Sequence, residues 1–583
     1  MDGVNVDHAG AIVDHIDIWT SAVQAKSSSG RGSSKKRELY GIKKLRELIL
    51  ELAVRGKLVP QDPNDEPASV LLERISDERA RLIAEGKIKK SKVFSSVTEQ
   101  EQVFEVPSSW CWLKLGSIGY DHGQKKPDCS FTYIDVGAIN KEMGLIESAE
   151  ILEAEAAPSR ARKLVKEGTV IYSTIRPYLL NIAVVDRTIF PEPIASTAFA
   201  IIHPFEGILS SFVYRYLRSP SFVSYVESVQ TGVAYPAIND KQFFSGVIPI
   251  PPTEEQHRIV AKVDELMALC DQLEQQTEAS LDAHQVLVET LLATLTNSQD
   301  ATELMANWAR ISEHFDTLFT TEQSIDQLKQ TILQLAVMGK LVPQDPNDEP
   351  AAKLLERIAE EKAQLVKEKK IKKQKALPPI AEDEKPFELP KGWEWCRLQD
   401  LFSVVTDGDH QAPPKADSGV PFLVIGNLNT GNIKFEGCKF VPDSYYQKLD
   451  WTRQPVKGDL LYTVTGSYGI PIVVTENKPF CVQRHVAILN STKNTPIEFI
   501  QHVLLSKYSF DFATSVATGI AQKTVPLSGL RRMPVPLPPK NEVVDILEKI
   551  EVMMSICEEL KTCLKESQIT QLLLTDTIVE LAV

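Results

Sequence analysis

The chain has 583 residues, a formal net charge of −14 and a pI near 5.4. Its composition, 43% hydrophobic and 24% charged, is globular, and no apolar run approaches the ~18 residues that span a bilayer. The eight cysteines form no C-x-x-C pair, which argues against a zinc site and a disulfide scaffold and favours reduced thiols in the cytosol.

The N-terminal segment, residues 1–37, begins with a short amphipathic helix around Ile16 and Trp19. Its acidic start lacks the pattern of a signal peptide. The Ser/Gly/basic run KSSSGRGSSKKR (26–37) that follows is typical of a flexible linker, with a contact to DNA phosphates as the alternative interpretation.

Residues 51–92 recur at 334–375, with 30 of 42 positions identical at a constant offset of 283. Chance does not produce this identity, so the chain is internally duplicated. The match continues to the tryptophan pairs at 110/112 and 393/395, breaks for about 120 residues and resumes at an offset of 287. Each half is therefore a repeated frame around a diverged insert.

The frame begins with a helix over 38–54, which the cap signal Gly56 ends. The proline-rich GKLVPQDPNDEPA is an extended turn, and a second helix runs from Ala68 to Ile88. That helix ends in the basic run KIKK, which is either a solvated helix end or a contact with DNA or a partner.

The sequence pattern of each insert predicts a compact α/β domain of short strands and helices. In the first insert we expect strands at 131–139, 168–175, 181–186 and 195–202 and helices at 208–218 and 220–230. In the second we expect strands at 421–429, 458–466, 470–475 and 486–489 and a helix near 497–517. Tyr172, Tyr462 and the tryptophan pairs are expected in the core.

A long helix follows each insert, over 254–295 and 541–581. Apolar residues recur at alternating four- and three-residue steps, which is the pattern of a coiled-coil seam. We place the seam at Ile259, Val263, Leu266, Cys270, Leu273, Leu287 and Leu291, and at Ile546, Ile550, Met553, Cys557, Leu560, Leu574 and Ile578. Forty helical residues span about 60 Å, so paired helices would make a rod that holds the inserts apart. The chain ends in ELAV, the same residues as 51–54, so the repeat is circular and predicts a pseudo-two-fold arrangement.

Charge is distributed unevenly along the chain. Residues 107–250 have a net charge of −1 and residues 390–538 of +3, so the acidic charge lies on the frame. This basic footprint is weak for a protein that binds nucleic acid alone, which indicates help from a partner.

Catalytic motifs are missing from the sequence. It contains no G-x-x-x-x-G-K-[ST], G-x-S-x-G or H-E-x-x-H, and its ten histidines do not cluster with carboxylates at the spacing of metal ligands. We therefore expect no catalytic residue and no metal site in this chain.

Polar and aromatic residues of the inserts fall in turns and at strand ends. Arg and Lys can pair with guanine, Gln and Asn with adenine, and hydroxyls with bases or phosphate. Each residue alone is weak evidence, because an exposed loop Lys or Ser is more often simply solvated. The candidate DNA contacts are Lys125, Lys126, Ser173, Thr174, Arg176, Tyr178, Tyr235, Asn239 and Lys241 in the first insert, and His410, Gln411, Lys415, Thr465, Ser467, Tyr468, Arg484, Gln522 and Lys523 in the second.

The chain resembles the specificity subunits of type I restriction–modification systems. The resemblance rests on the repeated frame at 56–67, the closing prolines Pro252 and Pro539, TEEQHRIV (253–260) and GDLLYTVTGSYGIPIVV (458–474). One departure is KNEVVDIL (540–547), which lacks the glutamine and arginine present at 256 and 258, so the two frame copies need not have equal roles.

The resemblance implies an α+β protein: two α/β target-recognition domains separated by long, paired, coiled-coil-like helices, with an internal pseudo-two-fold repeat. The implied segments are 1–37 (helix and linker), 38–105 (frame), 106–252 (first recognition domain), 253–389 (long helix and second frame copy), 390–539 (second recognition domain) and 540–583 (long helix).

The resemblance further implies a cytoplasmic, non-catalytic reader of a bipartite, asymmetric site in double-stranded DNA. It would act with two methylation and two restriction subunits, which would bring S-adenosylmethionine, ATP and magnesium. A coiled-coil adaptor that does not read DNA, and an enzyme with an unrecognised site, are the rival interpretations.

Overall fold

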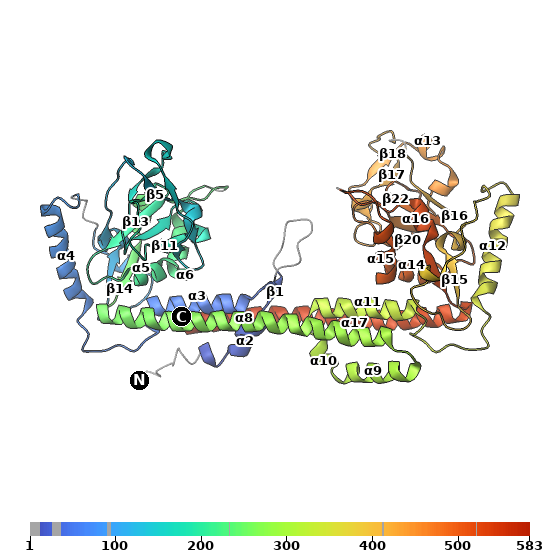
Figure 1. Cartoon of the computed structure of the whole chain (residues 1–583), viewed down its shortest axis with the longest axis horizontal. Helices are drawn as coiled ribbons and strands as arrows, with labels where there is room; N and C mark the ends of the chain where they lie inside the picture. Colours follow the sequence, from blue (N-terminus) through green and yellow to red (C-terminus); the bar gives the residue numbers. More distant parts are fainter. Residues whose placement is uncertain (1–11, 26–36, 90–94, 233, 411–412, 521) are drawn as a thin grey trace. The chain divides into compact units, whose positions relative to one another are not determined.

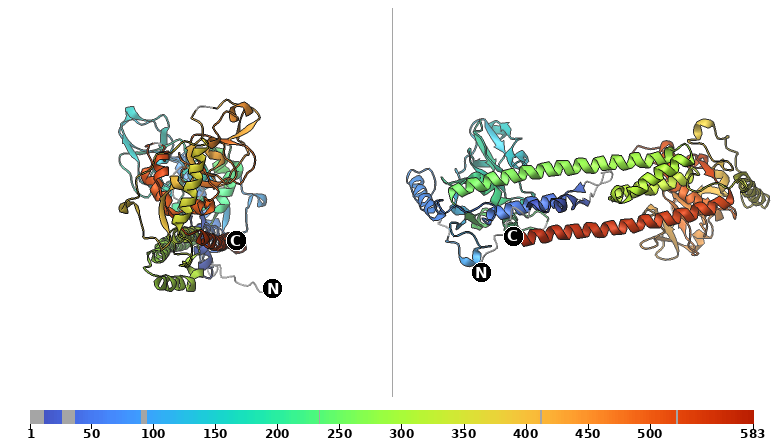
Figure 2. Two further views of the ribbon diagram at one scale, coloured as in Figure 1. Left: turned by 90° about the vertical axis from the view of Figure 1, so that its right-hand side faces the viewer. Right: turned by 90° about the horizontal axis from the view of Figure 1, so that it is seen from below.

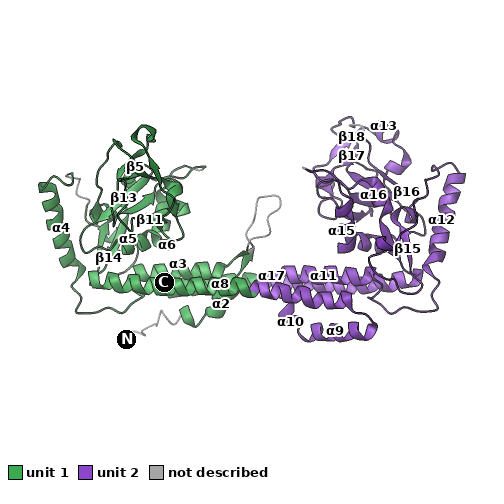
Figure 3. Cartoon of the chain, in the orientation of Figure 1, with its two compact units in different colours: residues 1–280, 567–583 green, residues 281–566 purple. Residues whose placement is uncertain are grey.

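The computed structural model describes residues 12–25, 37–89, 95–232, 234–410, 413–520 and 522–583. The chain divides into two compact units, residues 1–280 with 567–583 (unit 1) and residues 281–566 (unit 2), coloured separately in Figure 3. The C-terminal residues thus belong to the unit that contains the N-terminal half, as the circular repeat predicts.

Helices form the frame of unit 1, and α3 runs alongside α8 and the end of α17 (Figures 1 and 2). Arg46 Nη2 lies 2.7 Å from Glu274 Oε2 of α8, Tyr40 donates to Asp576 Oδ1 of α17 at 2.7 Å, and Lys57 Nζ donates to the Val583 carbonyl at 2.6 Å. The frame elements are α2 (Ile16–Ser21), α3 (Tyr40–Val54), α4 (Ala68–Ala84), α8 (Thr253–Asn297) and α17 (Lys540–Ala582), with a short pair β1 (Gln24–Ala25) and β2 (Arg37–Glu38).

Unit 2 repeats this frame. Its helices are α9 (Ala301–Glu313), α10 (Phe315–Leu318), α11 (Glu322–Val337) and α12 (Ala351–Lys367), joined by the second part of α8 and the first part of α17. Lys340 Nζ donates to the Thr296 carbonyl at 2.9 Å, which is the counterpart of the Lys57–Val583 bond. A buried cluster that includes Leu292 of α8, Ile332 of α11 and Cys557 of α17 forms the core of this frame.

The predicted seam is correct in the first half of each long helix and only partly correct in the second, where Leu291 packs against the core but two other residues do not. Ile259, Cys270 and Ile546 are buried, whereas Leu287 is 50% exposed and its neighbour Val288 is buried. The seam residue Leu574 is likewise 45% exposed. Apolar residues stand in succession at 286–288 and 572–574, so spacing alone does not choose the face that packs against α11 or α3.

The predicted frame helices are confirmed, with one boundary corrected. Gly56 ends α3 in the left-handed region (φ +71°), and a side chain there would lie 2.6 Å from the ring of Pro107, so glycine is required. Helix α4 ends at Ala84 rather than Ile88, because Gly86 adopts φ +69° and terminates it. The run KIKK therefore lies beyond the helix.

The insert of unit 1 contains two four-stranded sheets, ordered β11-β10-β13-β4 and β8-β5-β12-β9, with all pairs antiparallel except β5/β12. The strands are β3 (Cys111–Lys114), β4 (Gly119–Tyr120), β5 (Phe131–Ile134), β6 (Ile139–Asn140), β7 (Leu145–Ile146), β8 (Glu150–Leu152), β9 (Ala161–Leu164), β10 (Val170–Ser173), β11 (Ile182–Val184), β12 (Pro193–Ser196), β13 (Phe199–Pro204) and β14 (Val247–Ile250). The helices are α5 (Ser210–Leu217), α6 (Pro220–Val229) and α7 (Asp240–Ser245).

The insert of unit 2 has the corresponding sheets, β16-β22-β19-β20 and β18-β17-β21, the latter with a parallel β17/β21 pair. Its strands are β15 (Glu394–Arg397), β16 (Val404–Asp407), β17 (Val420–Leu423), β18 (Lys439–Val441), β19 (Leu460–Thr463), β20 (Pro471–Val473), β21 (Cys481–Val482), β22 (Val486–Asn490) and β23 (Pro534–Leu537). Its helices are α13 (Asp443–Tyr446), α14 (Ile497–Leu505), α15 (Lys507–Val516) and α16 (Leu527–Arg532). In both units an outer strand pair, β3/β14 or β15/β23, joins the entrance and exit of the insert.

Three predicted elements are in fact divided. The expected strand 131–139 contains β5 and β6, which lie in different sheets. The expected strand 195–202 belongs to β12 and β13, which lie in different sheets, and the expected helix near 497–517 breaks at Ser506 into α14 and α15. The Ser506 side chain accepts from the Ser509 backbone N–H and thereby begins α15.

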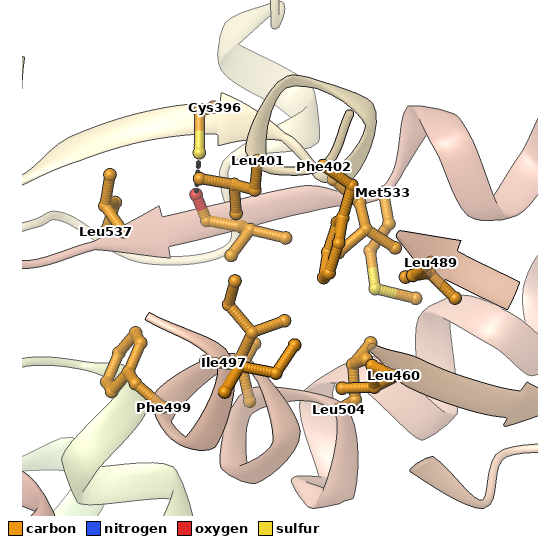
Figure 4. Close-up of a cluster of buried hydrophobic side chains, with 14 of the residues drawn as sticks. Cys396, Leu401, Phe402, Leu460, Leu489, Ile497, Phe499, Leu504, Met533 and Leu537 are labelled. Carbon is orange, nitrogen blue, oxygen red and sulfur yellow. Dashed lines mark hydrogen bonds between the residues drawn. The ribbon is translucent and has the colours of Figure 1, made fainter. Parts of the chain in front are cut away.

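The core of the second insert is apolar and closely packed, and Figure 4 shows part of it. Leu401 and Phe402 gather with Met533 and Leu489, and Cys396 Sγ donates to the Val535 carbonyl at 3.4 Å. Of the residues expected in the core, Trp110, Tyr172, Trp393 and Tyr462 are buried, whereas Trp112 and Trp395 are only half-buried.

The frame copies differ where the sequence departs from the repeat. Arg258 forms a bidentate pair with Asp65, and the buried Gln256 donates to the Pro251 carbonyl at 3.1 Å. At the positions of Arg258 and Gln256, 287 residues later, unit 2 has Asp545 and Val543, and its Asp348 accepts instead from Asn541 at 2.8 Å. The second copy therefore lacks an ion pair that the first possesses.

Candidate nucleic-acid interface

Two segments of the first insert are joined into one surface, which we call loop pair 1: residues 174–180 after β10, and residues 230–232 and 234–239 between α6 and α7. The Arg176 backbone N–H donates to the Pro236 carbonyl at 2.8 Å, and the Ile238 N–H donates to the Thr174 carbonyl at 3.0 Å. The candidates Thr174, Arg176 and Tyr178 of the first segment are thereby brought close to Tyr235 of the second.

Arg176 and Tyr235 form the exposed centre of loop pair 1. The Arg176 guanidinium lies 4.8 Å from the centre of the Tyr235 ring, and Tyr235 is 69% exposed. An exposed cation–π contact contributes only about 0.5–1 kcal/mol. It therefore orients the guanidinium but is weak enough to leave it free to bind a ligand. Arg176 and Leu180 are both in the left-handed region, at φ 49° and 53°, and such strained backbone is typical of functional loops.

Ser173 and Thr174 support the loop and do not face solvent, which corrects their assignment as DNA contacts. Both are buried, the Ser173 hydroxyl donates to the Ile175 carbonyl, and the Thr174 hydroxyl donates to the Ala198 carbonyl, each at 2.9 Å. A hydroxyl satisfied in this way stabilises the strand end.

The N-terminus of α7 borders loop pair 1. Asn239 caps α7 by accepting from the Gln242 N–H at 2.9 Å, while Lys241 is exposed on its first turn. The sequence interpretation missed Lys163, which is buried and donates to the Phe199 carbonyl at 2.6 Å and to Asp240 Oδ2 at 3.1 Å. Lys163 thus links β9 and β13 to α7, and no spacing in the sequence indicates this link.

Lys125 and Lys126 lie in the segment beside β9, since the Lys125 N–H donates to the Arg162 carbonyl at 2.8 Å. The Lys125 ammonium is held between Asp128 and Glu192, each at 2.8 Å, whereas the Lys126 side chain is exposed. Lys126 is therefore the more available of the two.

The second insert has the same backbone arrangement with different side chains. Loop pair 2 consists of residues 464–469, 517–520 and 522–525. In it the Gly466 N–H donates to the Lys523 carbonyl at 3.0 Å and the Val525 N–H donates to the Val464 carbonyl at 2.8 Å. Gly466 occupies the place of Arg176, and Gln522 that of Tyr235. The conserved geometry therefore presents different chemistry in the two units.

The candidates in loop pair 2 divide by exposure. Thr465 is buried and accepts from the Thr524 hydroxyl at 3.2 Å, so its assignment as a DNA contact is also corrected. Tyr468 is half-buried and stacks on Phe510 at 5.7 Å. The exposed candidates are Ser467, Gln522 and Lys523.

One exposed residue of loop pair 2 was missed. Ile520 is fully exposed near the middle of the second segment, next to Gly519. An apolar side chain placed in this way suits contact with a thymine methyl group. Its position beside a glycine in a loop was the only feature of the sequence that could have indicated its exposure.

A second group of candidates surrounds Asp409 in the same insert. His410 Nε2 lies 3.1 Å from Asp407 Oδ2, while Asp409 accepts from Tyr445 at 3.0 Å and pairs with Arg453 at 3.1 Å. Burial, together with the bond to Asp409, raises the pKa of Tyr445. Arg453 and Tyr445 were not among the predicted residues.

Arg484 and Lys415 complete the candidates of the second insert. A bridge between Asp409 and Gln483 brings the exposed Arg484 next to the segment of His410, and Lys415 is also exposed. Gln411 lies outside the described residues.

Within the described residues, no group of three or more His, Cys, Asp or Glu side chains is arranged to hold a metal ion. Nor does any helix in that part of the chain have the length and apolar character needed to cross a membrane.

Comparison with known proteins identifies the family. The model of the type I restriction modification DNA specificity domain matches residues 123–283 and 390–571, which contain both loop pairs. The specificity subunit of the type I restriction enzyme EcoAI from Escherichia coli is 41% identical over 98% of this chain and 99% of its own length. The chain belongs to the type I restriction enzyme specificity subunits.

Other known proteins are also similar to this specificity subunit. The EcoEI specificity subunit of Escherichia coli is 42% identical over 98% of this chain and 99% of its own length. Among solved structures, the HsdS subunit from Thermoanaerobacter tengcongensis is 23% identical, covers 83% of this chain and 98% of its own, and superposes with a TM-score of 0.40. A chain from a structure of a type I restriction–modification system is 22% identical. It covers 82% of this chain and 98% of its own length, with a TM-score of 0.45.

Proposed function

We propose that this specificity subunit is a non-catalytic reader of a bipartite, asymmetric DNA sequence, with one half-site read by each insert. One observation carries the proposal: the two loop pairs have the same backbone hydrogen bonds but present Arg176 and Tyr235 in one case and Gly466 and Gln522 in the other. A repeated scaffold with different exposed groups suits the reading of two different half-sites.

We assign the base and phosphate contacts to exposed residues of both inserts. Arginine pairs with the O6 and N7 atoms of guanine and glutamine with N6 and N7 of adenine, while lysine neutralises phosphate. The proposed contacts are Lys126, Arg176, Tyr178, Tyr235 and Lys241 for one half-site, and His410, Lys415, Ser467, Tyr468, Arg484, Gln522 and Lys523 for the other.

The frame is proposed as the docking site of partner subunits. Because its helices occur in two copies, it offers two similar surfaces, which suits two methylation subunits and, with them, two restriction subunits. The acidic frame favours protein docking over DNA wrapping. S-adenosylmethionine, ATP and magnesium would then be bound by those subunits, in the cytoplasm, and the long helices would set the spacing of the half-sites.

The proposal is tested by selecting binding sequences from random duplex DNA with the chain co-expressed with its methylation subunit. We expect two different short motifs at one fixed spacing. Arg176→Ala should relax the first motif alone and Arg484→Ala the second alone. Arg187→Ala, an exposed arginine of the first insert outside the loop pair, is the matched control and should change neither. Selection without any sequence preference, from a folded complex, would favour the adaptor interpretation instead.

A further inference from the structure

A strongly basic segment follows α12, and the proposed reading of DNA by the loop pairs does not use it. Residues 367–375, KEKKIKKQK, contain six lysines and one glutamate, a net charge of +5 in a chain of net charge −14. We call this segment the lysine strap. Its counterpart in unit 1, residues 84–92, has a net charge of +3.

The turn at the start of the strap contains a lysine in a backbone conformation that favours glycine. Helix α12 ends at Lys367, and Lys369 then adopts φ +58°, the left-handed conformation that caps the helix. The corresponding residue of unit 1 is Gly86, at φ +69°. Glycine adopts this conformation freely and lysine does not, so the second copy has a charged side chain where the fold favours glycine.

The strap is held against the second insert along its length. Trp451 Nε1 donates to the Lys370 carbonyl at 3.0 Å, Gln374 Nε2 donates to the Ser403 carbonyl at 3.0 Å, and Ile371 is buried. These anchors alternate with exposed lysines. The segment is therefore an ordered surface and not a loose tail.

The lysines between the anchors are available to a ligand. Lys369, Lys372, Lys373 and Lys375 are exposed, and over the described ranges no carboxylate lies within ion-pair distance of their ammonium groups. Lys370, in contrast, pairs with Glu368 at 2.8 Å. The strap thus presents four exposed lysines without an ion-pair partner in the described part of the chain, along a short, fixed path, with Asp450 as a more distant acidic neighbour of Lys372.

The position of the strap connects it to the candidate interface. Trp451, which anchors Lys370, is two residues from Arg453, which pairs with Asp409 beside His410. The strap and the His410 group are therefore joined through one short turn, residues 451–453.

We propose that the lysine strap binds the phosphate backbone of the DNA duplex next to the half-site read by the second insert. The inference rests on the proposed DNA-reading function. Lysine acts as a point charge toward phosphate and adds affinity without reading sequence. Protein interfaces are depleted in lysine, and the only apolar side chain of the strap, Ile371, is buried, so an acidic protein surface is the less suitable partner.

The test measures how DNA affinity depends on salt, with the full chain in complex with its methylation subunit and a duplex that contains the selected site. The triple variant Lys372→Gln, Lys373→Gln, Lys375→Gln removes three exposed charges. We expect the slope of log K against log [salt] to become shallower by about 0.9 for each lost phosphate contact, so by about 2.7 for three. The motifs recovered from random duplexes should be unchanged.

A control variant removes the same number of charges elsewhere: Lys141→Gln, Lys457→Gln, Lys493→Gln, at exposed positions of the inserts outside the frame and the proposed contacts. It should leave the slope as in the wild type. If the strap variant and the control have equal slopes, the inference is wrong. Loss of the methylation subunit from the strap variant with an unchanged slope would also overturn it, because the strap would then be a protein contact.

Lys369→Gly separates binding from folding. It copies the residue of unit 1 and removes the strained lysine, so the melting temperature should not fall, while the salt slope should decrease by about 0.9. An unchanged slope in this variant contradicts a role for Lys369 in the strap. The failure of the proposed function is distinguishable, since the wild-type complex would then show no sequence preference whatever the slope.

Discussion

Trp110 Nε1 donates a hydrogen bond to Glu255 Oε2 at 3.0 Å, and Trp393 makes the same bond to Glu542 at 2.9 Å. In each unit the indole lies before the first strand of the insert, and the carboxylate lies in the first turn of the long helix. The bond thus joins the entrance of the insert to the frame. Burial raises the pKa of both carboxyl groups, although these hydrogen bonds act in the opposite direction.

Trp110→Phe should destabilise unit 1 and Trp393→Phe unit 2 by similar amounts. Each substitution removes one donor from a buried carboxylate, and an unsatisfied buried group costs about 1–3 kcal/mol. Urea unfolding of the full chain measures the change. Trp451→Phe, whose indole bonds to a carbonyl at an exposed site, is the control and should have a smaller effect.

Acid should destabilise unit 1 through a histidine pair. Burial lowers the pKa of His122 from 6.5 to about 4 and also lowers the pKa of His203, whose ring lies 4.5 Å away. The unfolded chain binds protons on these rings near pH 6.5 and the folded chain does not. Stability present above pH 6.5 is therefore lost as the pH falls toward 4.

The measurement is the melting temperature between pH 6.5 and 4. His122→Phe keeps a ring in the same place and should make the loss of stability shallower. His257→Phe, at an exposed position of α8, should keep the wild-type dependence. The same steep loss in both variants would show that other groups dominate.

Asp545→Arg should supply unit 2 with the ion pair that it lacks. The new side chain would face Asp348 as Arg258 faces Asp65, and Asp545 itself helps to raise the pKa of Glu542. A partly exposed ion pair contributes about 0.2–1 kcal/mol, so the free energy of unfolding should rise by about this amount. Asp545→Ala separates the removal of a negative charge from the new pair. Equal stability of the two variants would contradict pairing.

Lys163→Met should weaken the reading of the first half-site, although the buried Lys163 side chain does not contact DNA itself. The lysine positions α7 through Asp240 and β13 through the Phe199 carbonyl, so its loss should loosen the border of loop pair 1. We expect reduced affinity for duplexes with an intact first half-site and an unchanged preference at the second. Lys166→Met, at an exposed position near β9, is the matched control. A reduced preference at both half-sites would indicate general unfolding.

The predicted seam shows where spacing stops being informative. Residues 259–270 and 546–557 follow a single apolar periodicity, and their buried faces agree with it. At 286–288 and 572–574 the apolar residues are consecutive. Several faces of the helix therefore carry an apolar residue that could pack in the core. Packing against the neighbouring helix selects Val288 over Leu287.

The predicted contacts show the same limit at the candidate interface. Arg176, Tyr235, Gln522 and Lys523 were found from residue type and loop position, and they are exposed. Ser173, Thr174 and Thr465 have the same polar character but are buried, because the loop pairs fold over the strand ends. Hydroxyl groups at a strand end look alike in sequence whether they face solvent or a backbone carbonyl.

The sequence by itself determined the duplication, the frame helices, the diverged inserts and the family, because identity at a constant offset and helical periodicity are properties of the linear order. Only the tertiary structure decided which side chains meet: Arg176 on Tyr235, Lys163 on Asp240, Arg453 on Asp409. These pairs are separated by tens of residues, and their contacts depend on sheet register and loop closure. Neither leaves a periodic signal in the chain.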